Sequence, residues 1–185
     1  MKMIVAITGA SGMNYSLALL RELKLKQIEV HLIISEWAEV VLKEETNKKV
    51  SDLKKLAYKT YSNNNLAASV SSSSFLVDGM IIIPSSIKTV SEILHAHTSN
   101  LITRCADNML KTKKPLVIGL RETPLSGPTL ENLWKLSLYG AIIFPLSPAF
   151  YHKPKKIKDL EAFIVGKALD LLGVKNNTFN RWEKN

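Results

Sequence analysis

The feature that most constrains the fold is the stretch from Met3 to Met13, which reads MIVAITGASGM. Mostly apolar, β-favouring residues from Ile4 to Thr8 run directly into a Gly-Ala-Ser-Gly turn. Apolar residues then recur at helical spacing, at Leu17, Leu20 and Leu23. The pattern predicts a strand, a small-residue loop and a helix, which is the opening unit of an α/β domain.

The same loop is a candidate phosphate site. Gly9 and Gly12 can adopt positive φ and allow a ligand close to the backbone. The free N–H groups at the start of the helix favour an anion, and Ser11 adds a hydroxyl there. GASG is shorter than the full dinucleotide fingerprint, so an ordinary tight βα turn remains an alternative. The motif therefore indicates the fold class more strongly than the ligand.

Strand and helix patterns alternate along the rest of the chain. Ser35 is predicted to cap the second helix, Ser51 a short helix carrying Leu53 and Leu56, and Thr129 a later one. Between 46 and 74 the pattern weakens, and the polar stretch 62–65 with the serine run 71–74 predicts a surface excursion beside the sheet. The expected strands are 4–8, 30–34, 79–84, 116–120 and 141–144. The expected helices include 37–45, one ending at 94, 102–110, 129–138 and 158–172.

This alternation predicts a Rossmann-like α/β fold, a doubly wound parallel sheet flanked by helices with right-handed crossovers. The length of 185 residues and the apolar share of 46% fit one domain over residues 1–185. No apolar run reaches the roughly 18 residues of a membrane span, and no charged leader precedes the first strand. We therefore expect a soluble, cytoplasmic protein without membrane contact.

Charge and cysteine content narrow the function classes. The net charge of +9 fits an anionic ligand, a nucleic-acid surface or a lysine-rich exterior. The basic cluster 152–158 lacks a docking module and interleaved aromatic residues, so no nucleic-acid partner is predicted. The lone Cys105 cannot form an intrachain disulfide and has no neighbours at metal-ligand spacing. We expect it to be a small buried apolar residue and predict no metal site.

Polar residues follow several of the predicted strands. In open α/β sheets, ligands bind outside the carboxyl ends of the strands, so these side chains are expected to converge on one crevice. They are Ser11, Ser35, Ser86, Lys88, Thr89, Arg121, Glu122 and Tyr151.

The chain resembles the UbiX-type flavin prenyltransferases, which are related to the flavin-containing cysteine decarboxylases. The resemblance extends over nearly the whole length, and RETPL and PAFYH are its most specific parts. It is carried by TGASG at 8–12, Ser35, Glu45-Thr46, PSSIKT at 84–89, SNLITRCAD at 99–107, Lys111, KPLVIGLRETPL at 114–125, PAFYH at 148–152 and RW at 181–182.

The resemblance implies an enzyme that joins a dimethylallyl group from dimethylallyl phosphate to N5 and C6 of reduced FMN. The product would serve a UbiD-type decarboxylase, and the enzyme would be a homo-oligomer, a dodecamer. The implied FMN-binding residues are Gly9, Ala10, Ser11, Ser35, Ser86, Ile87, Lys88, Thr89 and Arg121. The implied donor-binding residues are Arg104, Lys111, Tyr151, Lys167 and Trp182. The implied catalytic residues are Glu45, Glu122, Ser11 and Lys111.

The chemistry of these residue types fits that reaction. A prenyl phosphate ionises with negative charge building on its leaving oxygens, which a cluster of Arg, Lys and Tyr stabilises without a metal. An aromatic wall from Tyr151 or Trp182 would keep water from the allylic cation. Many relatives carry Arg where this chain has Lys167, which replaces a bidentate fork with a point charge.

Each assignment also has a simpler interpretation. Arg104 and Lys111, seven residues apart, could form a solvated helix stripe. Glu45 could be a surface residue, Glu122 an ion-pair partner of Arg121, and Lys88 a solvated side chain.

Two other functions remain open. A flavin-dependent cysteine decarboxylase would need a catalytic His and a PxMNxxMW-like segment, and neither is matched. A non-catalytic FMN-binding accessory subunit would not need a second phosphate site. The polar tail 173–185, which holds Trp182, is expected to dock on a neighbouring subunit.

Overall fold

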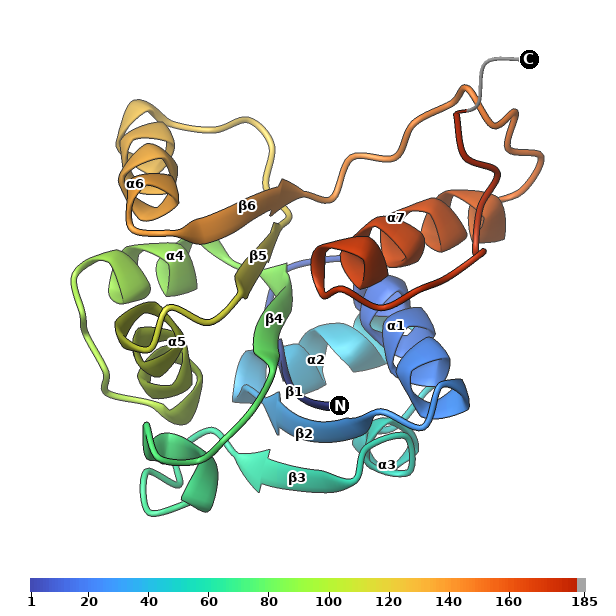
Figure 1. Cartoon of the computed structure of the whole chain (residues 1–185). Coiled ribbons are helices and arrows are strands. Elements are labelled where there is room, and N and C mark those ends of the chain that lie inside the picture. The colour runs from blue at the N-terminus through green and yellow to red at the C-terminus, as the bar shows by residue number, and fades with distance from the viewer. Residues whose placement is uncertain (183–185) are drawn as a thin grey trace.

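The computed structural model describes residues 1–182. In that part of the chain, six parallel strands form one sheet in the order β3-β2-β1-β4-β5-β6 (Figure 1). The predicted doubly wound α/β fold is therefore confirmed. The strands are β1 (Lys2–Ile7), β2 (Glu29–Ile34), β3 (Lys59–Ser62), β4 (Gly79–Ser85), β5 (Leu116–Leu120) and β6 (Ala141–Pro145).

Helices cover both faces of the sheet, because side chains alternate along each strand. In β1, Val5 and Ile7 face one apolar core, whereas Ile4 and Ala6 face the other. The first core lies under α1 (Met13–Leu25), α2 (Glu36–Glu45), α3 (Val50–Lys54) and α7 (Ile157–Leu171). The second lies under α4 (Ile87–Leu94), α5 (Leu101–Lys111), α6 (Gly127–Leu138) and the short helix η1 (Ser69–Ser71). Figure 1 shows α4, α5 and α6 grouped on one side and α1, α2 and α7 on the other.

The chain changes face between β1 and β4, which are neighbours in the middle of the sheet. The helix after β1 covers the first face, and the helix after β4 covers the second. The loops at the carboxyl ends of these two strands therefore separate and leave a crevice, the usual ligand position in this fold. All seven residues of β4 are buried, as predicted for a strand covered on both faces.

Several local predictions were wrong. The edge strand β3, in which only Tyr61 is buried, was not predicted; it lies in the segment 46–74, where the pattern is weak. Ser51 lies inside α3, whose N-cap residue is Lys49. Thr129 lies inside α6, and the Ser126 side chain caps that helix by accepting from the Thr129 N–H.

The tail after α7 packs on its own chain. Arg181 donates to both carboxylate oxygens of Asp170 at 2.9 and 2.8 Å, and Asn176 is buried against Gly166. Trp182 contacts Tyr151 edge-on, with ring centroids 5.3 Å apart, yet remains 71% exposed. Residues 183–185 of the predicted docking tail lie outside the described residues.

The structure also bears on the predictions for Cys105 and for membrane-spanning helices. Cys105 is fully buried, as expected, and burial raises the pKa of its thiol to about 12. In the part of the chain that the structure describes, no helix has the length and apolar content that a bilayer span requires.

Candidate functional site

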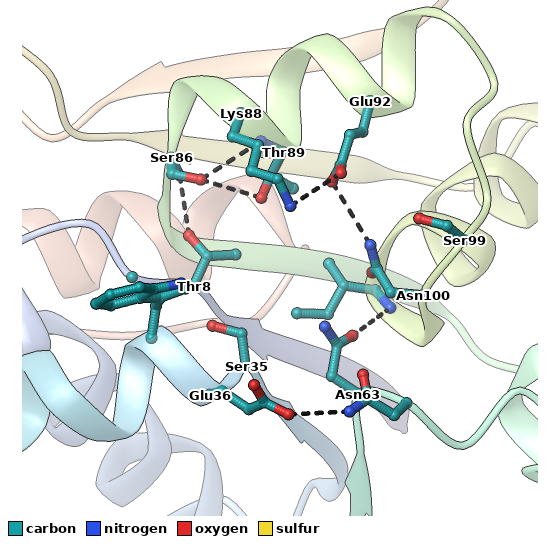
Figure 2. Close-up of a pocket in the computed structure, with 14 residues that line it drawn as sticks. Thr8, Ser35, Glu36, Asn63, Ser86, Lys88, Thr89, Glu92, Ser99 and Asn100 are labelled. Carbon is teal, nitrogen blue, oxygen red and sulfur yellow. Dashed lines mark hydrogen bonds and ion pairs between the residues drawn. The ribbon is translucent and has the colours of Figure 1, made fainter.

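At the carboxyl edge of the sheet, mostly polar residues surround a hollow of about 510 Å³, which we call the switch-point hollow. Residues from the ends of β1, β2 and β4 meet there, as the strand order requires. Figure 2 shows these side chains pointing toward one space. The lining is Thr8, Gly9, Ser35, Glu36, Trp37, Asn63, Asn64, Ser86, Lys88, Thr89, Glu92, Ser99, Asn100 and Ile102.

Three helices begin at this hollow, and each has a side-chain N-cap. Ser35 accepts from the Ala38 N–H at the start of α2, and Ser86 accepts from the Thr89 N–H at the start of α4. Asn100 caps α5 in the same way. The positive ends of three helix dipoles therefore converge on one space, which favours an anion. Because the Ser35 hydroxyl accepts from its own helix, its O–H remains available to donate to a ligand.

The wall beside β1 is fixed by tight packing. The Thr8 hydroxyl donates to the Pro84 carbonyl and accepts from the Ser86 N–H, both at 2.9 Å, which ties β1 to β4. A Cβ at Gly9 would lie 2.5 Å from the Cβ of Trp37. Only glycine permits this approach of α2 to the loop, so Gly9 has a packing role here.

A second hollow of about 470 Å³ lies on the other side of the same loop; we call it the Glu45 hollow. The GASG loop separates the two, since Gly9 lines the first hollow and Gly12 the second. The lining of the Glu45 hollow is Ser11, Gly12, Asn14, Tyr15, Glu45, Arg121, Leu146, Ile157, Leu160 and Glu161.

Glu45 reaches from the end of α2 to the start of α1. One of its oxygens accepts from the Gly12 and Met13 N–H groups, each at 2.9 Å. Gly12 is the N-cap residue of α1 and, with φ of 113°, offers no side-chain cap. The anion expected at the GASG loop is thus supplied by the chain's own carboxylate. Glu45 is an exposed residue, but it is also held at the start of α1 by these hydrogen bonds.

The protonation state of Glu45 follows from this contact. Burial would raise the pKa of its carboxyl, but three hydrogen bonds and the nearby Arg121 charge outweigh burial and lower the pKa. The bonds come from the Ser11 hydroxyl and the Met13 and Gly12 N–H groups. Glu45 is therefore a carboxylate at neutral pH, able to accept a proton but not to donate one. Burial and the charge of Glu161 raise the pKa of neighbouring Tyr15.

The expected single crevice is therefore two adjacent hollows. Gly9, Ser35, Ser86, Lys88 and Thr89 line the first, and Ser11, Arg121 and Glu45 line the second. Ala10 is buried, while Ile87 and Glu122 are exposed; none of the three lines either hollow. The Lys88 ammonium is paired with Glu92 at 3.0 Å. Glu122 accepts from the Thr123 N–H rather than pairing with Arg121 among the described residues.

The expected donor-binding residues form two separate groups. Arg104 and Lys111 are exposed on α5, and Lys111 is paired with Asp107 of the same helix at 2.7 Å. Ile102, in the first turn of α5, lines the switch-point hollow, and Lys111 lies about 14 Å farther along the same helix.

The other group, Tyr151, Lys167 and Trp182, lies on and beside α7. Phe163, Lys167 and Asp170 share a helix face through spacings of four and three. Phe163 contacts Tyr151, with ring centroids 5.9 Å apart, and Asp170 holds Arg181 beside Trp182. Because α5 and α7 cover opposite faces of the sheet, one chain does not bring the two groups together.

Several residues that line the switch-point hollow were not predicted as site residues, among them Asn63, Glu92 and Asn100. Asn100 directly precedes an apolar helical pattern, a recognisable N-cap signal. Glu92 lies one turn after Lys88, which predicts an ion pair. Asn63 gave no usable signal, because its partners are 38 and 39 residues away.

Comparison with known proteins places the chain in a family. Residues 1–169 match the Flavoprotein family. The flavin prenyltransferase UbiX of Methanocaldococcus jannaschii is 44% identical over 182 residues, which are 98% of this chain and 98% of that protein. The chain belongs to the flavin prenyltransferase family.

Two solved structures of similar proteins agree in fold over nearly the full length. A crystal structure of AnUbiX in complex with FMN and dimethylallyl pyrophosphate matches with a TM-score of 0.97 and 42% identity, covering 99% of this chain and 97% of that one. A dodecameric FMN-dependent UbiX-like decarboxylase from Escherichia coli O157:H7 matches with a TM-score of 0.97 and 38% identity, covering 100% of both chains. The family assignment thus rests on sequence and on fold.

Proposed function

We propose that this protein is a metal-independent transferase that moves a dimethylallyl group from dimethylallyl phosphate to N5 and C6 of reduced FMN. The prenylated FMN then serves a UbiD-type decarboxylase. The observation that carries the proposal is the pair of hollows at the carboxyl edge, one built for a phosphate and one holding an ionised carboxylate. Family membership supports it, because a relative of 42% identity is described with both FMN and a dimethylallyl donor.

The residues present fit FMN. Three helix N-termini and the free O–H of Ser35 face one hollow, which suits the phosphate end of the molecule. The GASG loop, with Gly9 and Ser11, leads from there to Arg121 and Glu45, which suits the ring end. Bound there, FMN supplies the ring atoms that accept the prenyl group. In this proposal, Ala10, Ile87 and Lys88 bind FMN through their backbone groups.

The donor phosphate requires the remaining cations. Arg104, Lys111 and Lys167, with the Tyr151 hydroxyl, stabilise the charge that builds on the leaving oxygens. Tyr151 and Trp182 contact each other and form the aromatic wall for the allylic group. Trp182 is 71% exposed in one chain, which leaves its face available.

A complete donor site needs a second copy of the chain. Arg104 and Lys111 lie on the α5 face of the sheet, whereas Tyr151 and Lys167 lie on the α7 face. One phosphate cannot contact both faces of the same sheet, so two subunits must each supply half of the cluster. A homo-oligomer, and specifically a dodecamer, is therefore part of the proposal; a relative of 38% identity is described as dodecameric.

The carboxylates provide the proton chemistry. Loss of a ring proton must accompany bond formation to carbon, and Glu45 is ionised and therefore able to accept it. Ser11 donates to Glu45 and orients it. Glu122 is exposed at the end of β5 and completes the proposed set from outside the hollow.

The alternatives are less well supported. This chain does not match the catalytic His or the PxMNxxMW-like segment of the cysteine decarboxylases. An accessory subunit that only binds FMN would not need the two groups of cationic residues. The predicted cytoplasmic location and the lack of a nucleic-acid partner stay predictions.

One experiment tests the proposal. The protein is incubated anaerobically with reduced FMN and dimethylallyl phosphate, and the flavin is weighed by mass spectrometry. We expect a mass gain of one isoprenyl unit, and no gain when FMN or the protein is omitted. If the protein binds FMN but the flavin mass does not change, the protein binds flavin without transferring a prenyl group, and the proposal is wrong.

A further inference from the structure

The hollow proposed for the FMN phosphate is poor in positive charge. Its lining contains one lysine, Lys88, and that ammonium is paired with Glu92 at 3.0 Å. Glu36 adds a second carboxylate and accepts from the Asn64 side chain at 3.0 Å. A phosphate here must therefore be recognised by uncharged N–H and O–H donors and by helix N-termini.

Asn63 provides such a donor from the loop directly after β3, which does not lead straight into any of the three helices. Its backbone carbonyl accepts from the Leu101 N–H at 2.8 Å, and its side-chain Oδ1 accepts from the Ile102 N–H at 3.0 Å. Both bonds go to the first turn of α5, so the residue is fixed in position and orientation.

These contacts decide which way the carboxamide points. Because the Ile102 N–H is a donor, the atom facing it must be the oxygen, and the NH₂ group must face the other way. Figure 2 shows the Asn63 side chain inside the hollow, with its oxygen bonded toward α5 and the other end of the carboxamide turned into the open space. Asn63 lines the same hollow as Ser35 and Thr89.

From this geometry we infer that Asn63 binds the phosphate of FMN directly, by donating from its side-chain Nδ2 to a phosphate oxygen. The inference rests on the proposed function, since it takes FMN as the ligand of the hollow. The α5 contacts hold the carboxamide ready before the ligand arrives, which lowers the ordering cost of binding.

The test compares two substitutions of the same chemical kind. Asn63→Asp keeps an oxygen for the Ile102 N–H, removes the donor and adds a negative charge beside the phosphate. Asn65→Asp is the matched control: its Oδ1 accepts from the Ala67 N–H at 3.2 Å, and it does not line the hollow. Affinities for FMN and riboflavin are measured by flavin fluorescence, with melting temperatures in parallel.

We expect N63D to weaken FMN binding on the order of ten- to a hundredfold, the effect of losing a hydrogen bond to a charged group. Riboflavin affinity should hardly change, because riboflavin lacks the phosphate. The melting temperature should not fall, since a carboxylate at the start of α5 favours the helix. N65D should match the wild type in all three measurements. If N63D does not fold, the neutral variant N63S should likewise lose affinity for FMN while keeping its affinity for riboflavin.

Two results would overturn the inference. Wild-type FMN affinity in N63D would mean that no ligand contact exists. Equal losses of FMN and riboflavin affinity would mean that Asn63 only shapes the hollow. A wild-type protein that binds neither flavin would instead refute the proposed function, and the inference with it.

Discussion

Replacing Glu45 by Gln separates its structural role from its proposed chemical role. In the wild type, one carboxylate oxygen accepts from the Gly12 and Met13 N–H groups at 2.9 Å, and the other accepts from Gly12 at 3.2 Å. Glutamine keeps an oxygen for the two short bonds but loses the charge. Removing a charge from an exposed helix N-terminus costs about 0.3 to 1 kcal/mol, and the remaining bonds become neutral ones.

The free energy of unfolding of E45Q is therefore expected to be about 1 kcal/mol lower than that of the wild type. The loss is no larger because the Glu45 side chain is exposed and solvent screens its charge. For a domain of this length, that lowers the melting temperature by about 2 to 4 °C. Glu44→Gln is the control, because Glu44 is an exposed neighbour on the same helix and loses the same charge.

The pH dependence gives this prediction its sign. The pKa of Glu45 is lowered below its ordinary value of 4.5 in the folded protein, so its contribution is fully present above pH 4.5. As pH falls through the folded-state pKa, the wild-type carboxylate is protonated and loses that contribution. The gap in melting temperature between wild type and E45Q should thus be largest at neutral pH and close in acid. A gap that is absent, or that stays constant with pH, would refute the helix-capping role.

The chemical role is read from turnover. In E45Q, FMN binding should survive, while formation of prenylated flavin should fall about a hundredfold or more, the usual contribution of a general base. Wild-type turnover in E45Q would reduce Glu45 to a helix cap.

Further outcomes follow from the same geometry. Lys167→Met should reduce donor use about ten- to a hundredfold, partly in kcat at saturating donor, with FMN affinity unchanged in a binding titration. Arg104→Ala and Lys167→Met should each be impaired alone, and coexpressed mixed oligomers should regain activity, because some sites then receive both intact halves; no recovery would contradict a shared site. Gly166→Ala should lower the free energy of unfolding by about 1 to 3 kcal/mol, measured as a lower melting temperature, because a Cβ would overlap Thr178 and Phe179. The protein should bind FMN and not NAD in a thermal-shift assay, since Ser35 occupies the place of the acidic residue that binds an adenosine ribose.

Most of the sheet could be predicted from the sequence because its central strands are nearly all apolar. Gly79 to Ser85, for example, is buried at every position, and a short apolar run of this kind is typical of a strand covered on both faces. The edge strand β3 could not be predicted in the same way, since only one of its four residues is buried. Its backbone pairing with β2 supplies the stability that the side-chain pattern does not reveal.

The caps show a similar limit at shorter range. Ser126 and Thr129 are both good N-cap residues, three positions apart, and the sequence pattern favoured the second. In the structure Ser126 caps the helix and accepts from the Thr129 N–H, with Pro128 in the first turn. Proline at the start of a helix was the available signal, because it fits the first turn and not a position before the cap.

The division of the donor residues could not be seen from spacing. Arg104 and Lys111 share one helix face, and so do Phe163 and Lys167, but spacing within a helix does not say which face of the sheet the helix covers. That depends on α7 returning to the side of α1 after β6, through the long connection from 146 to 156. The five donor-binding residues were predicted to form one cluster, whereas the fold separates them into two groups.

The two proposed phosphate sites are built from different kinds of group, and the proposed reaction gives a reason. The FMN phosphate does not react, so its charge is the same in the ground state and in the transition state. Uncharged donors such as Ser35 and Asn63 hold it equally in both, which sets affinity and leaves turnover unchanged. The donor phosphate is the leaving group and gains charge as its bond breaks, so cations such as Arg104 and Lys167 stabilise the transition state more than the bound donor. A substitution in the switch-point hollow should therefore change the Kd for FMN, whereas one in the cation groups should change kcat.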